Sequence, residues 1–558
     1  MRLSLFLCLI LFPTLLFAQD NSGQINGDFN LNMQFYQDDK SIEADAPDEI
    51  ALNNSYLNII YTKGNFTLGV RYESYLNALL GYSREYQGND IIHRYATFNK
   101  DKLEVTAGNF YEQFGKGLTL RSYEDKGLGK DNSIDGIRIK YEPMDGLYIK
   151  SLIGKSRTFF TYSEGIIRGA DAEIHLNTLL NWDLKTNIQL GGNIVSRYQK
   201  KSDLVGDLDY EFPENVSVYS SRINLHHGNW EYYTEYAYKM NDPEGAGSYN
   251  YAPGNAIISN LTYSKRGFSV SLEGHRSDHF EFRSVRDKGS IFGENIINYL
   301  PTLGKQHTYS LLALHPPATQ IESEFGYQVD VFYKIKKGSS LGGKYGTNID
   351  LHYSKVMGLE TGPDGVRNYS YLDDRNEYTP SFMGDPDNLY YSDLNISIER
   401  KINKKLKINT IALSLQSYNK EVFEGSSGVI HSTIGVLDMT YKINRANAIR
   451  YEIQGLLAKE EDFLDDTYLE GDWSMGLIEY TINKETDWFF AIQDMYNWGN
   501  PDIKKQLHYF SIDIGCTKGV NRFALGYGKK RKGIFCVGGV CRDIDASNGF
   551  SLSISSNF

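Results

Sequence analysis

Apolar and polar side chains alternate along short segments from about residue 27 to the end of the chain. Residues 29–35 read FNLNMQF, which places the four apolar side chains on one face of an extended segment and the three polar ones on the other. A period of two is typical of a β-strand with two different environments on its faces. Residues 57–61 and 66–72 repeat the pattern on either side of a turn at 62–65, and together they predict a hairpin with one continuous apolar face.

The same hairpin unit returns along the whole chain. Each predicted strand has about 8 to 12 residues, the length that a tilted strand needs to cross a bilayer. With a first strand near residues 27–36 and a last one near 550–558, the pattern predicts about 24 strands, within a range of roughly 22 to 26. The eleven predicted tight turns lie at 62–65, 99–102, 142–146, 183–186, 226–229, 264–267, 336–340, 400–405, 442–447, 483–486 and 517–521.

Long polar connections alternate with these tight turns, so the two ends of the predicted sheet differ. In outer-membrane barrels the short turns face the periplasm and the long loops face outside. The pattern therefore predicts an all-β fold, a large antiparallel transmembrane β-barrel with short periplasmic turns and long extracellular loops. The long connections are 37–55, 77–91, 111–134, 199–216, 239–255, 275–320, 354–388, 415–431, 458–472, 495–506 and 528–549.

Hydropathy and aromatic content both favour a membrane barrel. After the first 18 residues no uncharged apolar stretch approaches the length of a membrane helix, and the mean hydropathy is −0.44. A closed barrel is the other way to satisfy every backbone hydrogen bond in hydrocarbon. The alternative is a soluble propeller or β-helix, but no repeat of about 40 to 50 residues is present. Aromatic residues make 13% of the chain, and those beside the tight turns fit a girdle at the membrane interface: Tyr61, Phe66, Phe98, Tyr141, Trp230, Tyr263, Phe268, Tyr333, Tyr441, Trp488 and Phe523.

The two ends of the chain carry targeting signals. Residues 1–18 have an early cation at Arg2 and an apolar run before Ala18, which predicts a secretory signal peptide. Residues 19–558 are predicted to form a single barrel domain, and the first strand follows so soon that we expect no separate plug domain before it. A terminal aromatic, Phe558, closes an alternating last strand. We expect it to engage the barrel-assembly machinery, with outer-membrane lipid as the surrounding partner.

The interior of a barrel of about 24 strands is too wide for wall side chains alone to fill. Polar side chains that alternate with the apolar face would line it, and both charge signs are present. The lumen must therefore contain water, inward-folded loops or another polypeptide. The candidates on the wall are Asp330, Lys334, Asp350, Lys407, Arg450 and Glu452.

Residues 108–136 are the best candidate for an internal constriction. They read GNFYEQFGKGLTLRSYEDKGLGKDNSIDG, with glycines that permit close approach or positive φ. We expect this loop to fold into the pore; the alternative is an external loop with internal ion pairs. Its charged cluster consists of Arg121, Glu124, Asp125, Asp131 and Asp135.

The same segment resembles a family of uncharacterised outer-membrane barrels from Bacteroidota, in which a similar QFG.GL.LRSYED stretch is followed by DN..DG. The resemblance extends over most of the chain after the signal peptide. It implies an outer-membrane barrel and no known reaction. It transfers no catalytic residue to this chain.

The remaining chemistry-bearing residues indicate no enzyme. Cys536 and Cys541 flank a Val-Gly-Gly-Val stretch and predict a disulfide in an oxidising compartment, whereas Cys516 shares a face with apolar residues. No metal site, cofactor site or catalytic set is expected, because the histidines are scattered and the C-x4-C spacing lacks nearby ligands. The formal charge of −12 argues against nucleic-acid binding.

Two functions are compatible with these sequence features. The first is a channel or lumen-binding transport protein for an unidentified solute. The second is a barrel subunit of a larger export, uptake or adhesion assembly, with a protein partner for its loops or lumen. The mixed charges of the predicted wall favour neither cations, anions nor sugars.

Overall fold

The structure, a computed structural model, describes residues 23–200, 212–243, 252–286, 295–361, 380–461 and 469–558. The predicted signal peptide, residues 1–18, lies outside these ranges. None of the described helices is long and apolar enough to cross a membrane.

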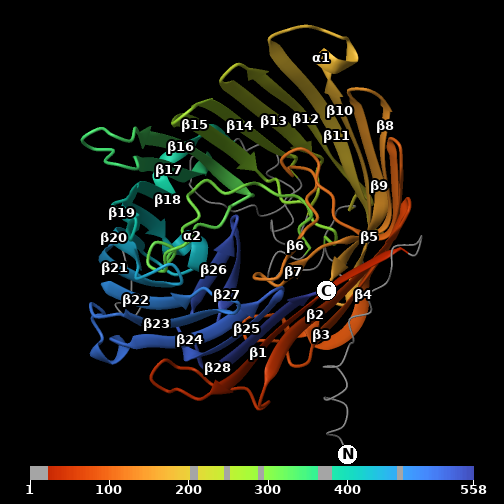
Figure 1. Cartoon of the computed structure of the whole chain (residues 1–558). Helices are drawn as coiled ribbons and strands as arrows, with labels where there is room; N and C mark the ends of the chain where they lie inside the picture. Colours follow the sequence, from red (N-terminus) through yellow and green to blue (C-terminus); the bar gives the residue numbers. More distant parts are fainter. Residues whose placement is uncertain (1–22, 201–211, 244–251, 287–294, 362–379, 462–468) are drawn as a thin grey trace, which may run out of the picture.

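Twenty-four antiparallel strands form one closed sheet, which confirms the predicted barrel (Figure 1). Closure comes from β1 (Gln24–Gln37), which pairs with β2 (Leu52–Lys63) on one side and β28 (Ser547–Asn557) on the other. The last residue strengthens this seam, because Phe558 and Gly27 exchange two backbone hydrogen bonds of 2.8 and 2.9 Å. Consecutive strands pair around the ring, so the barrel has no free edge.

The other barrel strands follow in chain order. They are β3 (Phe66–Tyr75), β4 (Gly88–Lys100), β5 (Leu103–Phe110), β8 (Ile134–Met144), β9 (Leu147–Thr158), β10 (Thr161–His175), β11 (Thr186–Tyr198), β12 (Asn215–His227), β13 (Trp230–Lys239), β14 (Gly254–Lys265), β15 (Phe268–Asp278), β16 (Ser323–Ile335), β17 (Thr347–Thr361), β18 (Pro380–Lys401), β19 (Leu406–Asn419), β20 (Val429–Lys442), β21 (Asn447–Glu461), β22 (Trp473–Ile482), β23 (Asp487–Tyr496), β24 (His508–Lys518) and β25 (Asn521–Lys530). The helical turns are η1 (Arg84–Tyr86), α1 (Leu176–Leu179), α2 (Lys420–Glu424) and η5 (Ile503–Lys505).

Alternation along each strand sorts side chains between the two faces of the wall. In β13, Tyr236 and Tyr238 are exposed on the outer face. Ala237 and Lys239, which alternate with them, are fully buried on the inner face. The outer surface of the barrel is apolar, as hydrocarbon requires. Its half-exposed aliphatic side chains include Leu68, Val70, Ile137, Ile153, Leu272, Leu413, Ile453, Ile478, Ile492 and Leu525.

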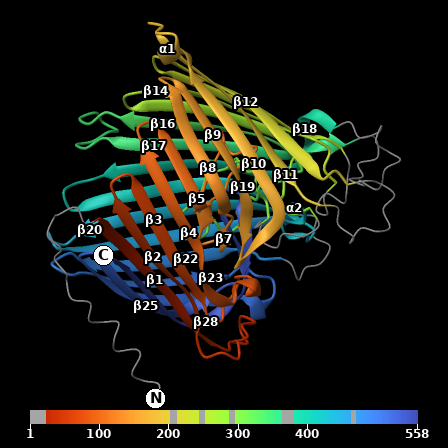
Figure 2. The same ribbon diagram turned by 90° about the vertical axis from the view of Figure 1, so that its right-hand side faces the viewer.

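Each of the eleven predicted tight turns joins two neighbouring barrel strands. The connection from β10 to β11 is longer than the pattern indicated and contains α1, which lies at one end of the wall (Figure 2). Aromatic rings of adjacent strands meet beside these turns, as between Phe66 and Phe98 (5.0 Å between ring centroids) and between Trp230 and Tyr263 (4.8 Å). The opposite end has one connection that the sequence pattern missed, a two-residue turn between β9 and β10.

Three segments from the long-loop end lie inside the barrel (Figure 1). The first inner segment, residues 111–133, contains the short pair β6 (Glu124–Asp125) and β7 (Lys130–Asp131). The second inner segment comprises the described residues 279–286 and 295–322. The terminal hairpin, residues 531–546, contains β26 (Gly533–Val537) and β27 (Val540–Ile544). The expectation that connections 275–320 and 528–549 are external loops was therefore wrong.

Candidate functional site

The first inner segment packs an apolar face against the barrel wall. Phe114, Leu118 and Leu120 are completely buried. Gly169 of β10 leaves space for the Phe114 ring, since a Cβ there would lie 2.9 Å from it. Burial of side chains of this size stabilises the docked segment by about 1.5 to 3 kcal/mol each. The wall side chains of this cluster are Ile134, Leu152, Ile167, Val195, Val216, Val218, Ala237, Ala256 and Ile258.

Polar contacts fix the depth of this segment near the middle of the strands. The backbone N–H of Lys116 donates to Glu235 Oε2 (2.8 Å), at the centre of β13. The Thr119 hydroxyl donates to Asn193 Oδ1 (2.7 Å) on β11. The segment therefore extends from the long-loop end to about half the height of the wall.

A buried ionic cluster joins the far part of the segment to two strands. Arg157 of β9, with no exposed side-chain surface, contacts Glu73 of β3 at 2.6 and 2.8 Å and Asp131 at 2.8 Å. Arg71 of β3 contacts Glu73 at 2.7 Å, Glu124 at 2.9 Å and also Asp131. Two arginines and three carboxylates thus pair with one another, all of them buried except Glu124, whose side chain is 23% exposed.

The charges of this cluster shift the carboxyl groups of the inner segment in opposite directions. Burial alone would raise the pKa of Asp131, but Arg157 and Arg71 outweigh it and lower that pKa to about 2. The pKa of Glu124 is raised instead, because burial exceeds the effect of Arg71, its main cationic partner. Asp131 is therefore the residue whose ionisation fastens the segment to the wall.

The second inner segment rests on another part of the wall through leucines. Leu311, Leu312 and Leu314 are buried against Ala412, Ile434, Val436, Leu456, Trp473, Met475 and Met495. Elsewhere the same segment forms ion pairs with barrel residues, as His307 does with Asp393 (2.6 Å) and Arg286 with Asp242 (3.0 Å), whereas the leucines have hydrogen bonds beside them. The Leu311 N–H donates to Gln454 Oε1 (2.9 Å), and Gln416 Nε2 donates to the Leu312 carbonyl (3.1 Å).

The two inner segments also contact each other. The Arg121 N–H donates to the Ile297 carbonyl (2.7 Å), and the Tyr299 N–H donates to the Gly117 carbonyl (2.9 Å). The Arg121 guanidinium lies 3.8 Å from the centroid of the Tyr299 ring and 4.3 Å from that of Tyr123. Arg121 is thus a contact between segments rather than a free cation in a pore.

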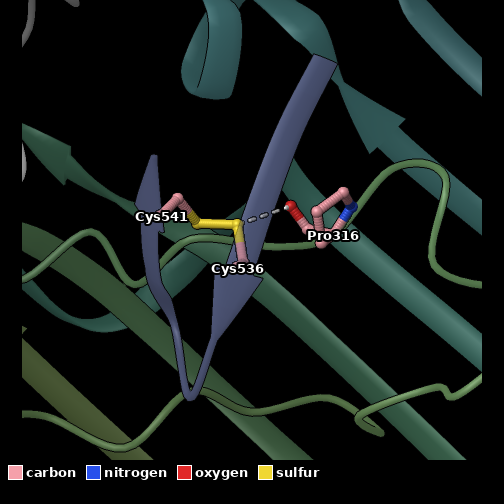
Figure 3. Close-up of a disulfide and its surroundings, with 3 residues drawn as sticks. All are labelled: Pro316, Cys536 and Cys541. Atoms are coloured by element: carbon pink, nitrogen blue, oxygen red, sulfur yellow. Dashed lines mark hydrogen bonds between the residues drawn. A yellow bond between two sulfur atoms is a disulfide. The ribbon is translucent and has the colours of Figure 1, made fainter. Parts of the chain in front are cut away.

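The terminal hairpin bridges both inner segments. A disulfide joins Cys536 to Cys541, and Cys536 Sγ lies 3.9 Å from the Pro316 carbonyl oxygen of the second segment (Figure 3). Tyr299 donates to the Gly538 carbonyl (2.8 Å), and Arg542 Nε donates to the carbonyl of Gly127 in the first segment (2.9 Å). Cys516 is a free thiol on β24.

Four of the five charged candidates in residues 108–136 lie within the first inner segment, and Asp135 does not. Asp125 accepts a hydrogen bond from the Leu128 N–H (2.9 Å) inside that segment. Asp135 belongs to β8 and shares its face with Ile137, which is exposed on the outside of the wall. It contacts Arg94 at 3.3 Å. Asp135 and Ile137 are two residues apart on one strand and therefore share a face, which places Asp135 on the outer face of the wall rather than in the lumen.

The six wall candidates lie on the inward face, mostly toward the short-turn end. Asp330 contacts His352 at 2.7 Å, and Lys407 contacts Glu399 at 2.7 Å. Arg450 contacts both Asp438 (3.0 Å) and Glu452. Lys334 and Asp350 also point inward, because each lies an even number of residues from an inward-facing neighbour on its strand. Lys334 pairs with Asn348 across the sheet, and Asp350 pairs with Phe332. The short-turn half of the lumen is therefore polar, while the long-loop half contains packed segments.

Sequence reasoning missed the apolar part of the inner wall. Residues 256–258 read Ala-Ile-Ile, so both faces of β14 are apolar at that height. Such a run is typical of a strand that is buried on both sides. This apolar run was the signal in the sequence that a segment of the chain packs against the inside of the barrel.

The family of unknown function DUF6029 matches residues 1–558. The chain belongs to this family. No curated protein matches the sequence. Among solved structures it is similar to the siderophore receptor PirA of Pseudomonas aeruginosa, with 6% identity over 97% of this chain and 81% of that one, and a TM-score of 0.40. A mutant of the ferric enterobactin receptor PfeA of the same species gives 10% identity, the same coverages and a TM-score of 0.43. OccAB4 of Acinetobacter baumannii gives 11% identity over 86% of this chain and all of that one, with a TM-score of 0.33.

The location of this family member follows from its own wall. A closed antiparallel barrel satisfies its backbone hydrogen bonds internally and presents apolar side chains outward. Both properties are those of barrels in outer membranes. The protein is an outer-membrane β-barrel.

Proposed function

We propose that this protein is a gated outer-membrane transport barrel for a small solute, closed by its inner segments. The observation that carries the proposal is the packing of Phe114 and Leu311, with their neighbours, against separate apolar areas of the inner wall. An open passive pore needs no apolar inner lining, whereas a gate needs a docked state of sufficient stability. The polar short-turn half supplies a compartment in which a solute can stay hydrated.

The proposal includes the partners expected of such a barrel. Outer-membrane lipid surrounds the wall, and Phe558 recruits the barrel-assembly machinery. Support comes from its place at the closing seam of the barrel, where it pairs with Gly27. Origin from Bacteroidota and removal of residues 1–18 before folding belong to the same proposal.

Current through planar lipid bilayers tests the gate. The intact protein should give small or infrequent currents, and deletion of Tyr111 to Asn132 should give larger, sustained ones. Deletion of residues 47–50 in the connection between β1 and β2 is the control, because it removes loop residues that do not belong to the inner segments. An unchanged current after the longer deletion would reject the gate.

A subunit of a larger assembly is the second candidate, and one observation favours it. The connection between β10 and β11, at the short-turn end, exposes Leu180, Trp182 and Leu184 to 46, 46 and 50%. A periplasmic partner would cover such side chains. Copurification of a stable partner that is lost on Leu184→Glu would support this candidate, and absence of any partner would count against it.

A further inference from the structure

We infer that the lumen contains a binding site for a small, neutral, hydroxyl-rich solute of monosaccharide size, on the side of the first inner segment that faces the short turns. This inference rests on the proposed transport function and names its class of solute. It comes from a cavity that none of the packing described above fills.

The cavity lies between the inner segment and four neighbouring strands. Its volume is about 160 Å³, which is below the roughly 300 to 1,000 Å³ of sites for drug-sized ligands. The inner segment contributes Gly115 and Lys116, and the wall contributes side chains of β10 to β13. A small solute fits this space better than an oligomer.

The wall residues that line the cavity lie near the short-turn ends of their strands, so the cavity opens toward that end of the barrel. Glu173 lies two residues before the end of β10, and Gln189 lies three residues after the start of β11. Asn224 and Tyr233 occupy the corresponding positions of β12 and β13. Since the inner segment covers the long-loop side, a solute reaches these groups from the polar half of the lumen.

The charged groups at the cavity already have partners. Arg222 donates to Asp171 at 2.6 and 3.1 Å and to Glu173 at 2.9 Å. Glu173 also contacts His175 at 2.9 Å. The Lys116 ammonium lies 5.3 Å from the centroid of the Tyr233 ring. An anion would meet the two carboxylates beside Arg222, and a cation would meet Arg222 and Lys116, so a neutral solute is favoured.

The side-chain amide of Asn224 retains hydrogen-bonding capacity for that solute. Asn224 Nδ2 makes only a long contact of 3.4 Å to Gln189 Oε1. Asn224 Oδ1 is buried and has no hydrogen-bond partner among the described residues. Buried polar atoms in proteins are normally paired. A hydroxyl group can accept from the amide N–H and, once the amide turns toward the cavity, donate to Oδ1.

A glycine makes room for the arginine that orients this site. A Cβ on Gly191 would lie 2.4 Å from Cζ of Arg222, so any side chain would displace the guanidinium. The next residue, Gly192, would bring its Cβ no nearer than 3.4 Å to another atom, the carbonyl oxygen of Ser220. These adjacent glycines supply a matched pair of variants.

The experiment is isothermal titration of the full-length, detergent-solubilised protein with glucose, glucosamine and glucose 6-phosphate. Saturable binding of glucose, at least tenfold tighter than that of either charged analogue, is expected. No saturable binding of glucose, galactose or mannitol overturns the inference, as does tighter binding of a charged analogue.

The variants then locate the site. Gly191→Ala should weaken glucose binding at least tenfold, and Gly192→Ala should leave it within twofold. Asn224→Leu is the second test if Gly191→Ala fails to fold, and it should also weaken binding at least tenfold. Undiminished binding by a folded Asn224→Leu protein places the site elsewhere and overturns the assignment.

Failure of this inference can be told from failure of the gate. Absence of glucose binding together with a larger current after deletion of residues 111–132 would remove the site and leave the gate. Glucose binding together with an unchanged current would remove the gate and leave the site as one for bound solute only.

Discussion

The two inner segments occupy the same lumen but are fastened to the barrel in different ways. The first is fastened by a buried cluster of Arg71, Arg157, Glu73, Glu124 and Asp131, in addition to its apolar face. The second has separate anchors along its length: Arg286 pairs with Asp242 (3.0 Å) and His307 with Asp393 (2.6 Å). Its leucines at 311–314 pack on the wall with hydrogen bonds beside them. A buried ion cluster is stable only while every partner is present, whereas apolar contacts can separate and re-form one by one. The comparison favours the first segment as the fixed part of the gate and the leucine-bearing part of the second, residues 311–314, as the moving part.

The largest effect should come from breaking the ionic cluster. Arg157→Met leaves Glu73 and Asp131 short of a cation in a buried site, which costs about 3 to 5 kcal/mol. The expected results are a lower midpoint in urea unfolding and a larger sustained current.

Arg94→Met is the matched control for this change. Its ion pair with Asp135 lies on the outer face, with the Arg94 side chain 52% exposed. Pairs of that kind contribute about 0 to 1 kcal/mol. Equal effects of the two substitutions would show that the inner cluster does not fasten the segment.

A smaller and more local effect is expected in the second segment. Leu311→Ala removes a fully buried side chain, and such truncations cost about 2 to 5 kcal/mol. Openings should become more frequent, while the unfolding midpoint of the barrel changes less than in Arg157→Met. Leu341→Ala, at a side chain 68% exposed in a short turn, should change neither quantity. Loss of barrel stability without more openings would contradict a moving second segment.

Acid should release the second segment before the first. Burial lowers the pKa of His315 from 6.5 to about 4. The nearby Glu470 carboxylate opposes this shift, and the cations Arg531 and Lys420 add to it. Since the released segment takes up this proton more readily, docking weakens as pH falls from about 6.5 to 4, by about 2 to 3 kcal/mol. Asp131 has a lowered pKa of about 2, so its contribution is complete above about pH 4 and is lost only as pH falls toward 2.

Current recorded as a function of pH separates the two steps. His315→Leu should remove the rise between pH 6.5 and 4 and leave the later one. Asp131→Asn should weaken docking of the first segment already at neutral pH. A single rise below pH 4 in the unmodified protein would contradict the difference between the segments.

The smallest effect should follow reduction of the Cys536–Cys541 disulfide. Closing so short a loop restricts the unfolded hairpin by about 2 kcal/mol, in the chain-entropy account. Cys536→Ser should make the terminal hairpin more sensitive to protease and raise the opening frequency slightly. Cys516→Ser, which removes the free thiol on β24, is the control and should do neither.

The wall was predictable because its determinants are local. Alternation in a stretch such as residues 66–72, together with the turn that precedes it, defines strand, face and hairpin partner without knowledge of the rest of the chain. Closure then followed from the number of strands and the membrane. The disulfide between Cys536 and Cys541 was visible for the same reason, since its two residues are close in sequence.

The interior was predictable only in part, because it depends on contacts distant in sequence. Leu311 meets Gln454, which is more than a hundred residues away, and nothing periodic near Leu311 indicates this. The first segment was recognisable from its dense charges, but Arg71 and Arg157, their partners, lie in strands that read as ordinary wall. Pairing between a loop and a wall residue has no local signature.

Formation of an engineered disulfide between the first inner segment and the wall tests the central claim most directly. Thr119 and Asn193 are buried and joined by a hydrogen bond of 2.7 Å, so Thr119→Cys with Asn193→Cys, in a Cys516→Ser background, brings two thiols together inside the barrel. We predict that the pair oxidises to a cross-link in the folded membrane protein and that the current stays small. No cross-link, with Thr119→Cys reacting freely with a bulky thiol reagent outside the membrane, would contradict a docked inner segment.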